Sequence, residues 1–263
     1  MGIVEGITEW LPISSTGHMI ILDELVKLNV SDAFREMFLV VIQLGAILAV
    51  VVLYFRKLWP FSTKEKFFIK KDTFGMWFKI LAACIPAAIV GVFFDDKINE
   101  LFYNYQTVAA MLIIFGVLFI VIENYNKKRK PVMNSIAEIS WKAAVGVGLF
   151  QLIAAVFPGT SRSGATILGG ILLGMSRTTA AEFTFFLAVP VMAGASLLKL
   201  VKFGLAFSAS EAVILLVGMV VAFVVSILVI KFLMNYIRRN DFKVFGWYRI
   251  VLGVLVFLFF SIL

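Results

Sequence analysis

Six long runs of apolar residues constrain this chain more than any other feature. The runs are Phe38–Phe55, Met76–Phe94, Thr107–Ile122, Phe183–Leu200, Ala212–Phe232 and Phe245–Leu263. A helix needs about 20 apolar residues to cross the hydrocarbon core of a bilayer. With 62% hydrophobic and 15% charged residues, the chain lacks the polar residues that cover a water-soluble domain. The sequence therefore predicts an all-α integral membrane protein with six transmembrane helices.

Two further apolar stretches, Gly2–Leu25 and Trp141–Met175, are interrupted midway by proline, glycine, serine and charged residues. Each stretch is too broken for one continuous helix, so we expect two shorter helices joined by a polar tip. Non-helical backbone at membrane depth is tolerated only where protein buries it or where it lines a water-filled cavity. The pattern predicts two re-entrant helical hairpins.

Positive charge is concentrated in three connections between the apolar runs. These connections are Arg56–Lys71, Lys127–Lys130 and Arg238–Lys243. Because basic connections stay on the cytoplasmic side, we expect all three there and the net acidic segment Asp95–Glu100 on the outer side. The second hairpin then enters from the cytoplasm and the first from the opposite face. The net charge of +8 fits loops that face anionic lipid better than it fits nucleic-acid binding.

The two hairpins are also related in sequence. Superimposing them aligns Pro12 with Pro158, Gly2 with Gly148, Glu5 with Gln151 and Ser15 with Ser161. Matching sequences that enter from opposite faces indicate an inverted-topology repeat, whose tips meet near the midplane. We expect a single polytopic membrane domain over residues 1–263, with repeats at about 1–123 and about 141–263 and a cytoplasmic linker at about 124–140.

The first tip carries two carboxylates, Glu5 and Glu9, one helical turn apart on the same face. Ionisable residues at membrane depth are costly and are functional by default. Two neighbouring carboxylates provide either a proton reservoir or a ligand pair for a divalent cation. The alternative is that this stretch lies at the wet membrane surface.

After Pro12, the first tip continues with the hydroxyl residues Ser14, Ser15 and Thr16 and with His18, the only histidine of the chain. A neutral imidazole can deprotonate Ser15, or it can itself attack phosphorus. The alternative is an ordinary histidine satisfied in the core or at the membrane interface. A single histidine disfavours the chemistry of type-2 phosphatidic acid phosphatases, which uses two.

The second tip combines small and hydroxyl residues, namely Gly159, Ser161, Ser163 and Thr166. Backbone N–H groups at such a tip and at the following helix N-terminus favour an anion. Arg162 adds a permanent planar cation suited to phosphate. The alternative is an internal ion pair between Arg162 and an acid of the first tip, which would hold the site together and is compatible with anion binding.

The segments EGITEWLPISSTGH and PGTSRSGAT closely resemble the two signature motifs of the undecaprenyl-diphosphate phosphatase family, also called bacitracin-resistance proteins. The similarity extends over essentially the whole chain. It implies hydrolysis of undecaprenyl diphosphate to the monophosphate plus inorganic phosphate, which recycles the lipid carrier of cell-wall synthesis. It also implies a multi-pass protein of the bacterial plasma membrane whose active site opens to the outer face.

The resemblance also assigns roles to residues of both tips. It implies that Glu5 and Glu9 are the acidic pair, Ser15 the candidate nucleophile, His18 the essential histidine and Arg162 the phosphate-binding arginine. Polar residues that we expect to bind substrate are Ser14, Thr16, Gly159, Ser161, Ser163 and Thr166. The family is associated with divalent cations, so we expect Mg²⁺ or Ca²⁺ on the acidic pair.

The expected partners are a polyprenyl diphosphate lipid and membrane lipids, without nucleic acid, and a homodimer stays open. The alternative function is a polyprenyl-phosphate flippase or an anion transporter, because transporters also use inverted repeats. The first helix is short: Met1 lies four residues before Glu5, whereas Trp141 lies ten before Gln151. We therefore expect either a start codon set too late or a truncated chain.

Overall fold

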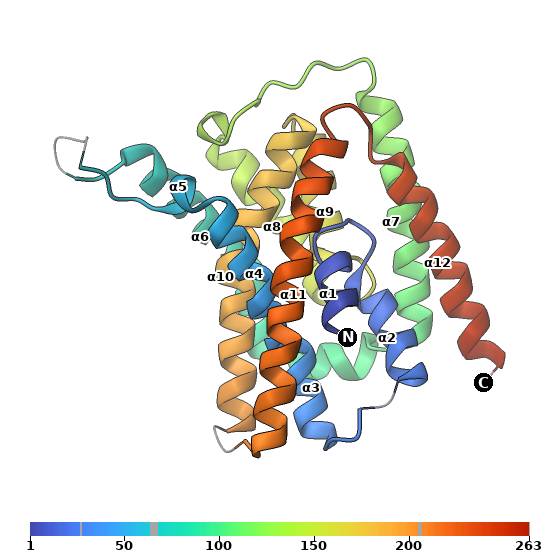
Figure 1. Ribbon diagram of the computed structural model, residues 1–263. Helices are drawn as coiled ribbons and strands as arrows, with labels where there is room; N and C mark the ends of the chain where they lie inside the picture. The colour runs from blue at the N-terminus through green and yellow to red at the C-terminus, as the bar shows by residue number, and fades with distance from the viewer. Residues whose placement is uncertain (27, 64–67, 205–206, 263) are drawn as a thin grey trace.

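The computed structural model describes residues 1–26, 28–63, 68–204 and 207–262, and the regular elements in these ranges are all helices (Figure 1). Six helical segments are long and apolar enough to cross a membrane. They are the helix pair α3 (Asp32–Val41) and α4 (Gln43–Leu53), α6 (Lys71–Phe102), α7 (Tyr105–Asn126), α10 (Arg177–Phe203), α11 (Ala209–Tyr236) and α12 (Lys243–Ile262). The predicted all-helical, multi-pass architecture with six apolar helices is confirmed.

Several of these helices extend beyond the apolar runs, because polar caps begin them earlier. The Ser31 hydroxyl accepts the Phe34 N–H at the start of α3, and the Ser176 hydroxyl accepts the Thr179 N–H at the start of α10. A serine at this position satisfies N–H groups that have no partner inside the helix. One expectation was wrong: residues 95–100 do not form a connection, since α6 remains helical to Phe102.

The two interrupted stretches each fold as two shorter helices, as their composition predicts. The first gives α1 (Gly2–Thr8) and α2 (Ser15–Leu25), and the second gives α8 (Trp141–Val156) and α9 (Arg162–Leu172). The remaining elements are the single turn α5 (Phe55–Leu58) and a 3₁₀ turn at Ile136–Glu138.

The two tips share a cap geometry. Aligning the tips on this geometry shifts them by one residue relative to the sequence superposition. Ser14 and Ser161 both have a positive φ, 73° and 67°, which is rare outside glycine. Each hydroxyl then accepts the N–H of a glycine three residues later, Gly17 or Gly164. Ser14 therefore corresponds to Ser161, and the predicted pairing of Ser15 with Ser161 was wrong because the second tip contains one extra residue.

Contacts between the two halves of the chain hold the helices together. Helix α1 packs on α11, α8 packs on α6, and α7 runs beside α12 (Figure 1). Glycine permits α4 to approach α11 closely, since a Cβ on Gly45 of α4 would lie 2.0 Å from the Met219 carbonyl oxygen of α11. This packing encloses both hairpin tips within the bundle, where Trp10 is fully buried.

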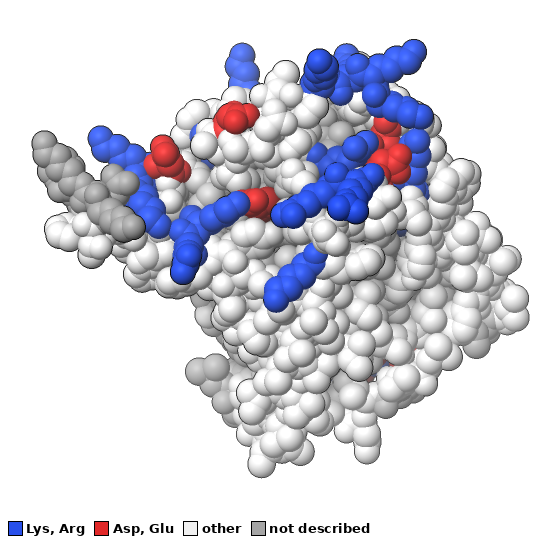
Figure 2. All heavy atoms as spheres, turned by 45° about the horizontal axis from the view of Figure 1, so that its top comes forward, with Lys and Arg blue, Asp and Glu red and all other residues white. Residues whose placement is uncertain are grey.

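The connections rich in lysine and arginine lie together at one end of the bundle, the top of Figure 1. Turned toward the viewer, this end shows a dense group of blue side chains (Figure 2). We call it the basic face, formed by residues 55–63 and 68–71, residues 127–140 and residues 237–243. Lys64 and Lys66, which contribute to the predicted charge of the first connection, lie outside the described residues.

Candidate active site

The two hairpin tips contact each other in the interior of the bundle. The Ser163 hydroxyl, from the start of α9, donates to the Leu11 carbonyl between α1 and α2 at 3.4 Å. A second contact joins Arg162 to Glu9, with Nη2 at 2.6 Å from Oε1. Both side chains are largely buried, at 13% and 8% exposure. The sequence left open an ion pair between Arg162 and an acid of the first tip. The structure contains this ion pair, and the acid is Glu9.

Glu9 also binds the hydroxyl that follows it in the first tip. The Ser15 Oγ donates to Glu9 Oε2 at 2.9 Å, while the other oxygen of the same carboxylate faces Arg162. Ser15 is the first residue of α2, and its side chain is half-buried. One carboxylate thus links the Ser15 hydroxyl of the first hairpin to the Arg162 guanidinium of the second.

The Arg162 guanidinium is held from several directions. Its Nη1 donates to the Thr184 carbonyl at 3.2 Å, and Nη2 also lies 3.2 Å from Met192 Sδ, both on α10. The centre of the guanidinium lies 5.9 Å from the Trp10 ring, which packs edge-on against Phe185 at 5.3 Å between ring centroids. Such a cation held before substrate arrives needs little reorganisation to bind phosphate.

The hydroxyls of the second tip mainly order the tip itself. Thr166 Oγ1 donates to the Arg162 carbonyl at 2.8 Å and accepts from the Thr184 hydroxyl at 2.9 Å. The Ser161 and Ser163 hydroxyls lie 3.2 Å apart. These hydrogen bonds shape the start of α9 around Arg162, and the predicted binding of substrate by these residues stays a prediction.

A positive φ also shapes the second tip at Gly159, where φ is 89°. A Cβ there would lie 2.5 Å from the Val108 carbonyl oxygen of α7, so the position excludes other residues on space as well as on conformation. The conformation turns the chain from α8 toward α9 and so sets the direction from which Arg162 enters the site.

Both ring nitrogens of His18 contact groups other than the Glu9 carboxylate. Its Nδ1 lies 2.7 Å from the Ser14 carbonyl, and its Nε2 lies 2.7 Å from the Tyr248 hydroxyl of α12. Because a carbonyl only accepts, Nδ1 carries the hydrogen and a neutral ring accepts the Tyr248 proton at Nε2. The two rings also stack at 5.6 Å between centroids. The predicted role of His18, as the base for Ser15 or as the nucleophile that attacks phosphorus, stays a prediction. Thr16, another residue expected to bind substrate, is half-buried near the start of α2.

Glu5 is buried beside Glu9, and its Oε1 has no hydrogen-bond partner. Its counterpart in the second hairpin, Gln151, is also buried, with both amide atoms unpartnered. Within the described part of the chain, no three His, Cys, Asp or Glu side chains gather as a metal-binding group. Two carboxylates fit a divalent cation only when further oxygen ligands come from elsewhere, such as a phosphate.

Arg249, which the sequence reasoning missed, joins the two tips from behind. It is fully buried on α12, over the Phe115 ring at 5.7 Å. Its guanidinium donates to four backbone carbonyls, those of Pro12 at 3.3 Å, Met111 at 3.4 Å, Gly159 at 3.0 Å and Thr160 at 2.7 Å. The sequence does contain a signal for this residue, since Arg249 is a charged residue inside a predicted transmembrane run.

This arrangement has the parts of a phosphoryl-transfer site. Arg162 offers a fixed cation, Ser15 offers a hydroxyl oxygen that can act as a nucleophile, and Glu9 lies where it can take the serine proton. The structure brings these three residues together, with Glu5 beside them, and positions them by Arg249 and Trp10.

Comparison with known proteins gives a consistent match over the chain. Residues 1–255 match the family model described as "Bacitracin resistance protein BacA". The "Undecaprenyl-diphosphatase" of Desulfitobacterium hafniense is 67% identical over 99% of this chain and 94% of its own length. The "Undecaprenyl-diphosphatase 1" of Clostridium acetobutylicum is 66% identical over 100% and 96%, and a relative from Enterococcus faecalis is 61% identical over 98% and 94%.

Proposed function

The chain belongs to the bacitracin resistance protein BacA family, and we propose that it hydrolyses undecaprenyl diphosphate to undecaprenyl phosphate and inorganic phosphate at the site between its two hairpin tips. One observation supports placing the reaction at these residues: the Glu9 carboxylate contacts Ser15 through one oxygen and Arg162 through the other. The reaction recycles the lipid carrier of cell-wall synthesis, in agreement with the family's bacitracin-resistance name.

In the first chemical step, Ser15 Oγ attacks the terminal phosphorus of the diphosphate held by Arg162. The Oγ–P bond forms, and the bond between this phosphorus and the bridging oxygen breaks. Glu9 takes the hydroxyl proton and passes it to the departing monophosphate. The 2.9 Å hydrogen bond from Ser15 to Glu9 supports this direction of proton transfer.

In the second step, water attacks the phosphoserine. The P–Oγ bond breaks, inorganic phosphate leaves, and the proton that water loses returns to Ser15 Oγ through Glu9. The same carboxylate therefore acts in both steps, and Arg162 compensates the charge that develops on the phosphoryl oxygens.

The role of His18 in this scheme is to position the start of α2. Its hydrogen bond to the Ser14 carbonyl and its contact with Tyr248 hold the turn that presents Ser15. A direct attack by His18 Nε2 on phosphorus is the mechanistic alternative, and it requires the Tyr248 hydrogen bond to break first.

A divalent cation, Mg²⁺ or Ca²⁺, would be held by Glu5 and Glu9 together with diphosphate oxygens. The unpartnered Oε1 of Glu5 supports this placement. A bound cation would supply charge neutralisation to the diphosphate. Titration of phosphate release with each cation tests it, and Glu5→Gln should raise the cation concentration needed for half-maximal activity.

The hairpins are re-entrant and the fold is an inverted repeat in this proposal. The matched caps at Ser14 and Ser161 support it, as does the reciprocal packing of α1 on α11 and α8 on α6. The basic face would then lie in the cytoplasm of a bacterial cell, with the site open to the outer face of the plasma membrane. Cysteine labelling from each side of intact cells, at residues 62 and 104, tests this orientation.

The function is tested by phosphate release from undecaprenyl diphosphate by the purified protein. We expect activity in the unaltered chain and a large loss in Ser15→Ala and Arg162→Ala. Matched controls at exposed positions, Ser261→Ala and Arg239→Ala, should keep it. Lipid movement across proteoliposomes without phosphate release would instead favour the flippase alternative.

A further inference from the structure

A cavity of about 520 Å³ opens on the basic face, away from the hairpin tips. Its walls come from the end of α7, the segment 129–132, the turn between α9 and α10, and the end of α11. Backbone hydrogen bonds fix part of this wall, because the Val132 and Met133 N–H groups both donate to the Gly174 carbonyl. The cavity is therefore built by ordered segments of both halves of the chain.

The lining of this cavity is strongly cationic. Its charged side chains are Arg129, Lys130, Arg177, Arg238 and Glu123. Glu123 is buried and fully engaged, because it accepts hydrogen bonds from the Arg177 guanidinium and from the Phe242 N–H. It therefore neutralises Arg177 alone.

The other three cations of the lining remain available to an anion. No ion pair among the described residues joins Arg129, Lys130 or Arg238 to a carboxylate. The Tyr125 ring holds the Arg129 guanidinium at 4.2 Å without cancelling its charge. Three uncompensated cations around one cavity favour an anionic ligand.

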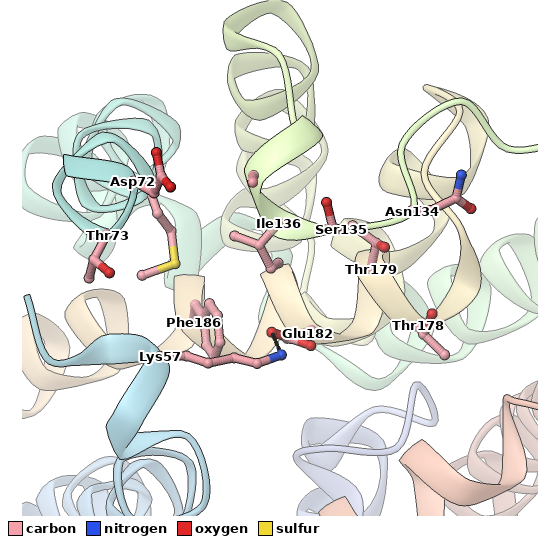
Figure 3. Close-up of a pocket in the computed structure, with 12 residues that line it drawn as sticks. Lys57, Asp72, Thr73, Asn134, Ser135, Ile136, Thr178, Thr179, Glu182 and Phe186 are labelled. Carbon is pink, nitrogen blue, oxygen red and sulfur yellow. Dashed lines mark hydrogen bonds and ion pairs between the residues drawn. The ribbon is translucent and has the colours of Figure 1, made fainter. Parts of the chain in front are cut away.

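A neighbouring cavity on the same face does not share this excess of positive charge. It measures about 370 Å³, and Figure 3 shows Lys57 extending to the Glu182 carboxylate within it. The two groups form a 2.7 Å ion pair, and Asp72 adds a further negative charge to the lining. This smaller cavity therefore has no excess of cations.

The cationic cavity also has an apolar wall that meets the surface. Leu172 and Leu173 line it and are 40% and 37% exposed, and Val132 beside them is 74% exposed. A free phosphate ion would use only the cations, whereas a molecule with both a phosphate and hydrocarbon chains would use both surfaces. The position at the ends of α7 and α11, two membrane-length helices, places the cavity at headgroup level.

We propose that this cavity binds one anionic phospholipid, with its phosphate among Arg129, Lys130 and Arg238 and its acyl chains along Leu172, Leu173 and Val132. Helix α9 runs from Arg162 to Leu172, so the lipid would brace the far end of the helix that carries the Arg162 guanidinium. This binding is separate from hydrolysis and does not depend on the proposed function.

The test counts lipids bound to the purified full-length protein by native mass spectrometry. The probes are dioleoyl phosphatidylglycerol, dioleoyl phosphatidylcholine with the same chains, and inorganic phosphate. The cavity variant is Arg129→Gln/Lys130→Gln/Arg238→Gln. Its matched control, Lys127→Gln/Lys128→Gln/Arg239→Gln, makes the same charge change on the same two connections outside the cavity lining.

We expect one phosphatidylglycerol to bind tightly, with affinity reduced about fivefold for each cavity cation removed and nearly unchanged in the control. The single variant Arg238→Gln should show one such fivefold step if the triple variant folds poorly. Equal losses in the cavity and control variants, or equal binding of phosphatidylcholine, would overturn the proposal. Competition by inorganic phosphate at millimolar concentration would identify a free-phosphate site and overturn the lipid assignment.

Discussion

Arg162 reaches from the second hairpin to place its Nη2 2.6 Å from Oε1 of Glu9 on the first. Neither hairpin contains both groups, so the site exists only where the two tips meet. The ion pair is largely buried, and breaking it from one side leaves an uncompensated charge inside the bundle. Substitutions at this pair therefore test the proposed site first.

Replacing Glu9 by glutamine keeps the shape of the side chain and removes its ability to take a proton. We expect Glu9→Gln to lower the rate of phosphate release by about 10²- to 10⁴-fold, the usual contribution of a positioned general base. Measured kcat and a thermal unfolding scan separate chemistry from folding. Glu138→Gln, on an exposed turn, is the control, and a Glu9→Gln rate within tenfold of the unaltered protein would contradict the assignment.

Lysine at position 162 would retain the charge but lose the planar fork that contacts Glu9, Thr184 and Met192 together. We expect Arg162→Lys to fold, to raise KM for the lipid diphosphate and to lower kcat/KM by more than about tenfold, since an ammonium group cannot make the paired contacts to phosphate that a guanidinium can make. Steady-state kinetics check this against Arg239→Lys on the basic face. An unchanged KM would show that Arg162 does not bind the diphosphate.

Arg249 should matter to stability because it satisfies carbonyls from both tips. Arg249→Met leaves three buried carbonyl groups and one half-buried carbonyl group without this donor, and we expect a loss of at least about 3 kcal/mol. The melting temperature should fall by about 6 °C or more for a chain of this size. Arg249→Lys should be intermediate, and Arg239→Met should be neutral. A melting temperature equal to that of the unaltered chain would refute the tethering role.

The backbone conformation at Gly159 favours glycine. With φ at 89° and a Val108 carbonyl oxygen 2.5 Å from the site of a Cβ, Gly159→Ala must shift the second tip. We expect a loss of about 1–3 kcal/mol, together with reduced phosphate release. Gly75→Ala, where a Cβ meets open space on α6, should be neutral or stabilising by up to about 1 kcal/mol. Equal behaviour of the two variants in thermal unfolding would rule out a strained tip.

Much of the fold follows from hydropathy and turn chemistry, which act over short distances. The apolar runs predict the six long helices, and the interruption midway through Gly2–Leu25 predicts the separation of α1 from α2. Helix ends were predicted less well, because caps such as Ser176 lie outside the apolar runs. The pairing of the tips was also misplaced by one residue, since an alignment on proline does not register the positive φ at Ser14.

Parts of the candidate site could likewise be predicted from the sequence, and other parts could not. Charges at membrane depth identify Glu9 and Arg162 from the sequence alone. Which acid meets Arg162 depends on how α1 faces α9, and that is a tertiary result. The contact between His18 and Tyr248 spans 230 positions of the chain, so no local pattern signals it. Arg249 was missed because a single charge near a basic connection resembles a topology signal.

In the proposed reaction, Ser15 Oγ attacks the terminal phosphorus, with Glu9 as its proton acceptor. The most direct measurement is an acid quench during turnover of undecaprenyl diphosphate labelled in its terminal phosphate, followed by peptide mapping. We expect an acid-stable phosphoserine at Ser15 that accumulates transiently and is absent in Ser15→Ala. An acid-labile label on His18, or full activity in Ser15→Ala, would contradict it.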